Sequence, residues 1–233
     1  MSAAMSGTLL ALSLAACAAL CSGAMLKLLL MVPAGTGTPA GVEPQRIHEG
    51  PTTRLGGLAV LVGFVVADGV AVHLDPAAML GLVPLSTAAL PVVWMGLWED
   101  VARSTSPMQR LVAAIASAAL ASAFAGGIVT RVDLPFLDAA LAYVPLAVAI
   151  SWFMVAGACN AFNIIDGVNG LAGGTALIAF VGMALVAWQV GDHAVLGQAA
   201  ALAGALLGFL VWNYPRGRVF LGDGGAYFTG FMY

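Results

Sequence analysis

Residues 160–174 read NAFNIIDGVNGLAGG and place three amides and one carboxylate between two strongly apolar stretches of the chain. Asparagine, aspartate and four glycines at a helix end expose side-chain oxygens and backbone N–H groups, which phosphate-bearing ligands and hard metal ions require. A tight loop between two helices has a similar composition. Polar groups beside lipid are costly unless they line a cavity or face water, so this stretch is predicted to be the functional centre.

The composition around this stretch is that of a membrane protein. The 233 residues are 61% hydrophobic and 8% charged, with a mean hydropathy of +1.00, whereas soluble domains carry about 25% charged residues. The net charge of -3 argues against a nucleic-acid surface. Cys17, Cys21 and Cys159 lack metal-site spacing, so we interpret them as small buried apolar residues.

We predict an all-α, polytopic membrane helical bundle that forms one domain over residues 1–233. Apolar segments of about 17 to 25 residues can cross a bilayer. Seven full crossings are predicted near residues 7–32, 57–74, 79–98, 109–129, 136–158, 171–190 and 194–212, and an eighth begins after Gly224 and is cut short. The first apolar run continues to Val32 and no Lys or Arg precedes it, so an uncleaved helix is predicted rather than a signal peptide.

Alternation of the loops places 33–56, 99–108, 159–170 and 213–223 on one face of the membrane. Most of the arginines lie on that face: Arg46, Arg54, Arg103, Arg216 and Arg218. The opposite loops carry only Arg131, so the first face is predicted to be cytoplasmic, with the N-terminus outside. The motifs PQRIHEGPTTRLGG (44–57), WED (98–100) and NYPRGRVFLGDGG (213–225) then open on the same surface as 160–174.

Four carboxylates are predicted to surround this cytoplasmic mouth: Glu99, Asp100, Asp166 and Asp223. Such a cluster repels itself unless it is protonated or neutralised by a cation, and oxygen ligands favour Mg²⁺ or Mn²⁺ over zinc. His48 is a lone loop histidine and is left out of the metal site. The arginines could bind phosphate oxygens, although topology signals and lipid headgroups also require basic residues here.

Asp68 is an acid inside the second apolar segment, near its outer end. Ionisable groups at membrane depth often have a function. Because the other polar motifs lie on the opposite side, we interpret Asp68 as snorkelling to the interface or forming an inter-helix hydrogen bond.

The order RxH…PTxRxGG, an acidic pair, NAFNIIDGVNGLAGG and FLGDGG resembles the polyprenyl-phosphate sugar-1-phosphate transferases, glycosyltransferase family 4. The resemblance runs from about Arg46 to Tyr233. It implies an Mg²⁺-dependent phosphotransferase, with Mn²⁺ as an alternative ion, that moves a sugar-1-phosphate from a UDP-sugar to undecaprenyl phosphate and releases UMP. The motifs NAFN and DGVNG look closer to the N-acetylhexosamine branch than to the muramoyl-pentapeptide branch. The resemblance implies cell-wall or surface-polysaccharide synthesis, including lipopolysaccharide, at a bacterial inner membrane.

The resemblance also implies a role for each matching residue. Asp223 would be the principal magnesium ligand, and Asn163 a second one. Glu99 and Asp100 take the place of the family's Asp-Asp pair, which handles or deprotonates the lipid phosphate. The remaining residues expected to bind substrate are Asp166, Asn169, Asn160, Arg103, Arg54 and Arg46.

Two features depart from the family pattern. Glu99 is one methylene longer than the usual aspartate, and reacting geometry is sensitive to about an ångström. The sequence stops at Tyr233, before a loop and helices of the relatives, so we expect a fragment that inserts in the membrane without turning over substrate. The expected partners are the bilayer, the UDP-sugar and the lipid phosphate. Whether the protein also forms a homodimer is left open by the sequence.

Two other functions remain open from the sequence. A transporter also uses glycine-interrupted helices, but places its polar groups near the midplane and often in paired repeats. An inactive remnant would bind nucleotide or lipid without turnover.

Overall fold

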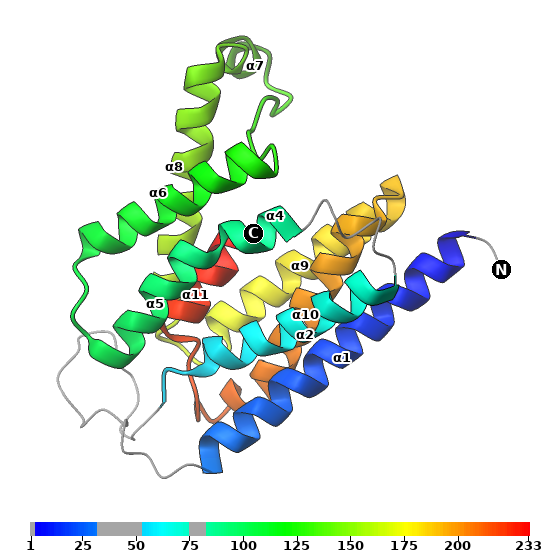
Figure 1. Ribbon diagram of the computed structural model, residues 1–233, viewed down its shortest axis with the longest axis vertical. Coiled ribbons are helices and arrows are strands. Elements are labelled where there is room, and N and C mark those ends of the chain that lie inside the picture. Colours follow the sequence, from blue (N-terminus) through cyan, green and yellow to red (C-terminus); the bar gives the residue numbers. More distant parts are fainter. Residues whose placement is uncertain (1–2, 32–52, 75–82) are drawn as a thin grey trace.

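The computed structural model describes residues 3–31, 53–74 and 83–233, which form a bundle of helices (Figure 1). The helices are α1 (Ala3–Met31), α2 (Gly56–Leu74), α4 (Val83–Ala88), α5 (Leu90–Ala102), α6 (Pro107–Phe124), α7 (Pro135–Leu141), α8 (Val144–Ile165), α9 (Leu171–Val190), α10 (His193–Asn213) and α11 (Gly222–Met232). Six of the described helices are long and apolar enough to cross a membrane, namely α1 from Gly7 onward, α2, α6, α8, α9 and α10. The predicted all-α polytopic bundle is confirmed.

Small residues allow α1 to lie directly along α10. Helix α1 packs against α10 and α2, and α10 also packs against α9. A Cβ at Gly204 would overlap the carbonyl oxygen of Ala15, and one at Gly208 would overlap that of Ala19. Glycine at these positions lets the two backbones touch, as is common where helices pack in lipid.

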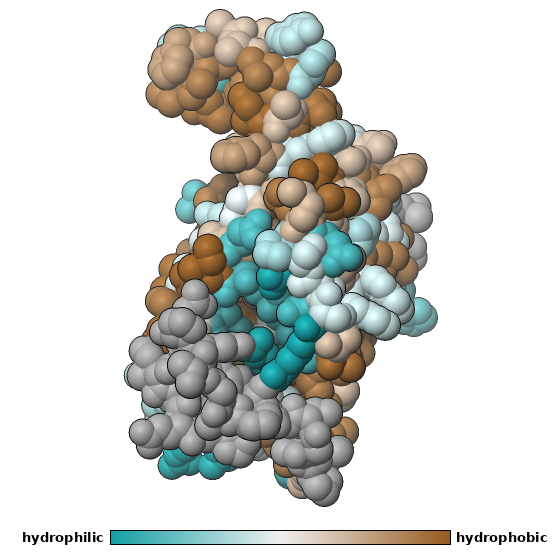
Figure 2. Space-filling view, turned by 90° about the vertical axis from the view of Figure 1, so that its left-hand side faces the viewer, coloured by the Kyte–Doolittle hydropathy of each residue, from teal (hydrophilic) through white to brown (hydrophobic). Residues whose placement is uncertain are grey.

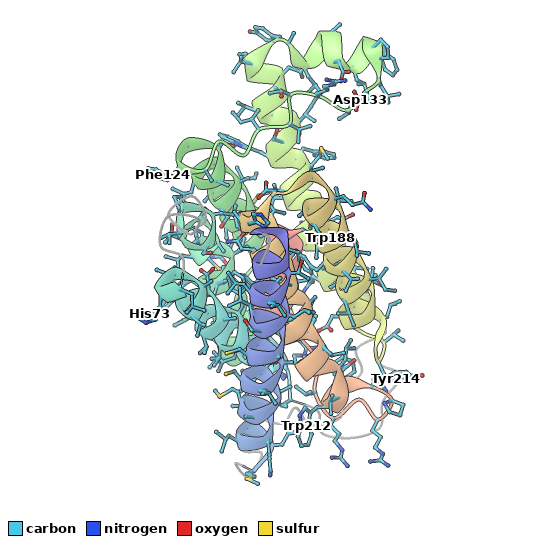
Figure 3. The ribbon with its side chains drawn as sticks, turned by 90° about the vertical axis from the view of Figure 1, so that its right-hand side faces the viewer. His73, Phe124, Asp133, Trp188, Trp212 and Tyr214 are labelled. Atoms are coloured by element: carbon cyan, nitrogen blue, oxygen red, sulfur yellow. The ribbon has the colours of Figure 1, made fainter. Side chains whose placement is uncertain are left out.

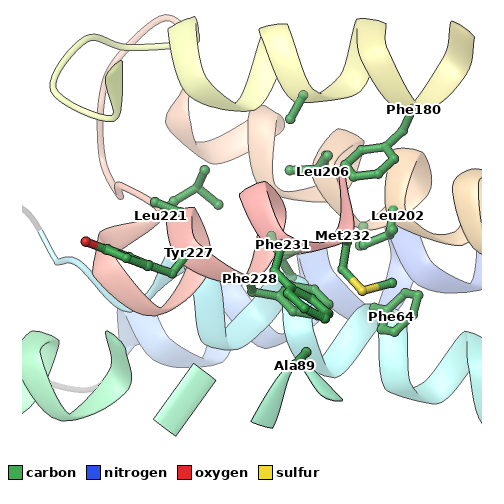
Figure 4. Close-up of a cluster of buried hydrophobic side chains, with 14 of the residues drawn as sticks. Phe64, Ala89, Phe180, Leu202, Leu206, Leu221, Tyr227, Phe228, Phe231 and Met232 are labelled. Carbon is green, nitrogen blue, oxygen red and sulfur yellow. The ribbon is translucent and has the colours of Figure 1, made fainter. Parts of the chain in front are cut away.

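Helix α11 occupies the centre of the bundle (Figure 1). It packs mainly against α5, α8 and α2, and all its residues from Gly222 to Met232 are buried. Figure 4 shows Phe228 and Met232 of α11 in an apolar cluster with Phe64 of α2. The Phe64 and Phe228 ring centroids lie 5.5 Å apart. The segment predicted as the start of an eighth crossing is therefore a buried helix against which α5, α8 and α2 pack.

The third predicted crossing, 79–98, is not one continuous helix. Its described part is divided into α4 and α5, which meet at Ala89. Pro91 lies in the first turn of α5, where a missing N–H is tolerated. Helix α5 then continues to Ala102, so Glu99 and Asp100 belong to its last turn rather than to a loop.

The fifth crossing was predicted at 136–158, and that range is wrong. The structure has the short helix α7 and then α8, which begins at Val144 with a proline in its first turn and ends at Ile165. Asn160 and Asn163 therefore lie on the last turns of α8, and the loop before α9 shortens to residues 166–170. Helix α8 tolerates Asn160 because its amide donates to the Ala156 carbonyl within the helix, at 2.8 Å.

Asp68 forms the inter-helix hydrogen bond expected from the sequence. Its Oδ2 accepts from the Ser86 hydroxyl of α4 at 3.4 Å. The Ser86 oxygen in turn accepts from the Gln198 amide of α10 at 3.5 Å. This chain of polar contacts links α2, α4 and α10 inside the apolar bundle.

Exposed apolar side chains on the described helices fit a lipid environment. Large apolar side chains are exposed on α9, including Ile178, Leu185 and Val190. On the side shown in Figure 2, many hydrophilic residues gather near the middle of the face, between hydrophobic surfaces.

Candidate active site

The described parts of the four predicted cytoplasmic loops gather at one end of the bundle. The Phe220 N–H donates to the Thr53 carbonyl at 3.0 Å and thereby joins the segment before α11 to the segment before α2. The Asn169 amide donates to the Pro215 carbonyl at 2.9 Å. The polar segments that precede α2, α9 and α11 thus form one continuous structure.

The buried side chain of Asn213 strengthens this structure. Its Oδ1 accepts from the Gly170 N–H at 2.6 Å, and its Nδ2 donates to the Val219 carbonyl at 2.7 Å. One amide therefore satisfies two backbone groups on different segments, which stabilises the connection between α10 and α11.

Asp100, on the last turn of α5, reaches the first turn of α11. Its Oδ1 accepts from the Asp223 N–H at 2.7 Å and its Oδ2 from the Gly224 N–H at 2.8 Å. The first N–H groups of a helix have no partner within the helix and carry partial positive charge. The Asp100 carboxylate satisfies two of them.

Asp166, directly after α8, binds the same turn through the backbone of the two residues before Asp223. Its Oδ2 accepts from the Gly222 N–H at 2.8 Å and its Oδ1 from the Leu221 N–H at 3.3 Å. Gly222 has a φ of +71°, a conformation that favours glycine. A Cβ there would overlap the carbonyl oxygen of Arg54 and lie 2.6 Å from Asp100 Oδ1.

Asp223 extends from this turn toward α6, where it forms an ion pair with Arg110. Its side chain is only 10% exposed, and that of Arg110 20%. Within the described part of the chain, the Nε of Arg110 is buried and has no hydrogen-bond partner. The guanidinium is also within electrostatic reach of Glu99 and Tyr227.

Glu99 forms its hydrogen bonds with the α5–α6 turn, although it is adjacent to Asp100 in sequence. Its Oε2 accepts from the N–H of Thr105 at 2.8 Å and from the Thr105 hydroxyl at 2.7 Å. Arg103, in the same turn, is exposed and has a left-handed backbone with a φ of 50°. The acidic pair thus divides between the α5–α6 turn and the start of α11.

Asn160 joins α8 to α11 on the other side of the site. Its Oδ1 accepts from the Tyr227 hydroxyl at 3.1 Å, and Figure 4 shows this hydroxyl directed away from the apolar cluster. Asn163 is half-buried one turn later. Arg54 is within electrostatic reach of Asp100, whereas Arg46 lies outside the described residues.

Burial and mutual repulsion change the acidity of the site. Burial raises the pKa of the Asp166 carboxyl to about 8, although hydrogen bonds from two backbone N–H groups act in the opposite direction. Burial likewise raises the pKa of Asp100, which lies beyond the predicted apolar segment, to about 7. The Asp223 carboxylate raises both pKa values further. A cation bound here would favour the ionised carboxylates.

The donor set suits magnesium better than a metal that needs an enclosed cage. Among the described residues, no three His, Cys, Asp or Glu side chains are placed to surround an ion. Magnesium is commonly held by one or two carboxylates, with water and substrate phosphates completing its coordination. The buried Asp223 carboxylate, beside two further acids, fits that requirement.

Comparison with known proteins assigns the chain to a family. Residues 82–233 match the model of glycosyl transferase family 4. The chain belongs to this family. The matched range includes Arg110 and all four acids, and excludes Arg46 and Arg54.

Bacterial relatives carry two related activities in their names. The chain is 46% identical over 90 residues to the phospho-N-acetylmuramoyl-pentapeptide-transferase of Anoxybacillus flavithermus, covering 39% of this chain and 26% of the relative. Over 75 residues, 32% of this chain and 23% of the relative, it is 51% identical to the same-named protein of Oceanobacillus iheyensis. A longer match, 25% identical over 190 residues, is to a probable undecaprenyl-phosphate N-acetylglucosaminyl 1-phosphate transferase of Bacillus subtilis, covering 80% of this chain and 51% of the relative. The matches span from about a quarter to half of these relatives' lengths.

The sequence did not identify Arg110, Tyr227 and Asn213 as parts of the site. Arg110 stood at the edge of a predicted crossing, and the other two lay in apolar segments or turns. Only the spacing of Arg110 from the acidic pair, on the adjoining helix, offered a signal. Their contacts depend on how α6, α8 and α10 pack around α11.

Proposed function

We propose that the full-length protein transfers a sugar-1-phosphate, an N-acetylhexosamine-1-phosphate, from a UDP-sugar to undecaprenyl phosphate and releases UMP. The observation that carries this proposal is the buried Asp223 beside Asp100, Asp166 and Arg110, in a chain of glycosyl transferase family 4. The names of the bacterial relatives support the same chemistry. The process served would be cell-wall or surface-polysaccharide synthesis.

The proposed reaction is phosphoryl transfer at the polar end of the bundle. Asp223, with Asn163 as a second ligand, would hold Mg²⁺ or Mn²⁺, which supplies charge neutralisation for the pyrophosphate and the departing UMP. Glu99 and Asp100 would bind or deprotonate the lipid phosphate, which arrives from the adjoining leaflet. The unused Nε of Arg110 offers a donor to a substrate phosphate.

The remaining proposed contacts surround this centre. The loop between α8 and α9 would form the nucleotide pocket. The proposed substrate-binding residues are Asp166, Asn169, Asn160, Arg103, Arg54 and Arg46. The positions of Asp166, Asn169 and Asn160 at the junction of α8, α9 and α11 support this role.

A transfer assay tests the proposal directly. The purified full-length gene product, in liposomes with undecaprenyl phosphate and Mg²⁺, is expected to convert radiolabelled UDP-N-acetylglucosamine into lipid-linked sugar and equimolar UMP. A chelator should stop the reaction. A parallel reaction with UDP-N-acetylmuramoyl-pentapeptide identifies the sugar. Absence of UMP with both donors would refute the proposal.

The proposed topology places this centre in the cytoplasm and the N-terminus outside. Figure 3 shows Asp133 and Tyr214 at opposite ends of the molecule. In a background without Cys17, Cys21 and Cys159, single cysteines at exposed positions 103 and 216 should resist an impermeant thiol reagent in intact cells. Cysteines at positions 131 and 192 should be labelled. The reverse pattern would overturn the orientation.

A further inference from the structure

The backbone N–H groups at the start of helix α11 donate to acceptors from distant parts of the chain. Its N-cap residue, Leu221, offers no polar side chain to the N–H groups of the first turn. Asp100 from α5 and Asp166 from the end of α8 accept these bonds instead, and each uses both carboxylate oxygens. Two acids from separate helices therefore fix where α11 begins.

Close packing makes this arrangement stiff. A Cβ built at Gly96 of α5 would lie 2.6 Å from the Gly224 backbone nitrogen, so the two backbones touch. Asp100 lies one turn beyond Gly96, on the same helix. The Asp223 side chain extends from the first turn of α11, whose N–H groups are bound by Asp100 and Asp166. The position of the Asp223 carboxylate therefore depends on the position of that turn.

We infer that Asp100 and Asp166 are positioning residues, which act through the backbone of α11 to place the Asp223 carboxylate. The inference rests on the proposed function and changes one part of it: Asp100 and Asp166 act through α11 instead of contacting the lipid phosphate and the nucleotide. Charge-assisted hydrogen bonds to backbone N–H groups are short and strongly directional, which suits this role. Asp223 is left as the acid of this trio that would hold the metal ion.

Asparagine variants of the full-length protein test the inference. Asparagine keeps the size of Asp100 or Asp166 and one acceptor, but it turns an NH₂ donor toward the second backbone N–H. We expect faster hydrogen exchange at residues 221–224. We also expect Mn²⁺, measured by electron paramagnetic resonance without substrates, to bind about tenfold more weakly. The KM for UDP-sugar should change less than roughly threefold.

Two further substitutions separate geometry from charge. Asp100→Glu keeps the negative charge but moves the carboxylate by one methylene, so it should weaken Mn²⁺ binding as Asp100→Asn does. Asp192→Asn is the matched control, because Asp192 is an exposed N-cap whose Oδ1 accepts from the Val195 N–H at 3.0 Å. This control should leave Mn²⁺ affinity and exchange at 221–224 unchanged.

Several results would overturn the inference. One is lost turnover in both asparagine variants with wild-type exchange and Mn²⁺ affinity, because the side chains would then touch substrate directly. Another is an increased KM for UDP-sugar in Asp166→Asn without faster exchange. If Asp100→Asn does not fold, Asp166→Asn carries the same test. A wild-type protein without transferase activity, whose variants still show the expected exchange and Mn²⁺ changes, would refute the proposed function and support the inference.

Discussion

The substitution Asp223→Asn is expected to reduce Mg²⁺-dependent UMP release by roughly a thousandfold or more in the full-length protein. Asparagine has nearly the same shape but no charge, and the buried Asp223 is the proposed metal ligand and the partner of Arg110. Metal stabilisation of developing charge is worth several kcal/mol, so losing the ligand should slow the chemical step rather than only weaken substrate binding. Steady-state kinetics over a range of Mg²⁺ concentrations measures the effect.

Asp133→Asn is the control for this charge removal. Asp133 is exposed, pairs with Arg131 at 2.6 Å, and has a φ of 59°, which asparagine also tolerates. Its variant should keep wild-type turnover. Turnover by Asp223→Asn close to the wild-type rate would mean that the metal binds elsewhere in the protein.

Gly222→Ala should remove most activity and destabilise the protein by about 2 kcal/mol or more. Alanine is strained at a φ of +71°, and its Cβ would meet the Arg54 carbonyl oxygen and the Asp100 carboxylate. Relief of that overlap must move α2, α5 or the start of α11. Thermal unfolding in detergent and the UMP-release assay measure the two effects.

The matched control for this glycine is Gly157→Ala in α8. Among the described residues, no heavy atom outside the adjoining backbone of α8 lies within 4 Å of a Cβ built at Gly157, so alanine should be neutral or slightly stabilising in the helix. Wild-type kinetics and stability in Gly222→Ala would show that the contact of Gly222 with Asp100 and Arg54 is not part of the active arrangement.

The membrane class and most helix positions follow from local sequence. The predicted ranges 57–74, 171–190 and 194–212 lie within about two residues of α2, α9 and α10, because hydrophobic length and helix geometry are local properties. Ranges that contain prolines were less accurate, since Pro91 and Pro145 each begin a new helix inside a continuous apolar stretch. Apolar composition does not show where such a helix restarts.

The sequence alone determined that this is an all-α membrane protein with its acids and amides at helix ends, because hydropathy and motif order can be read along the chain. Only the tertiary structure decided that Asp100 and Asp166 hold the start of α11 while Glu99 binds the α5–α6 turn. It also placed Arg110 of α6 on Asp223. These pairings depend on the rotation and packing of helices around a buried α11, and residues adjacent in sequence point to different neighbours around a helix axis.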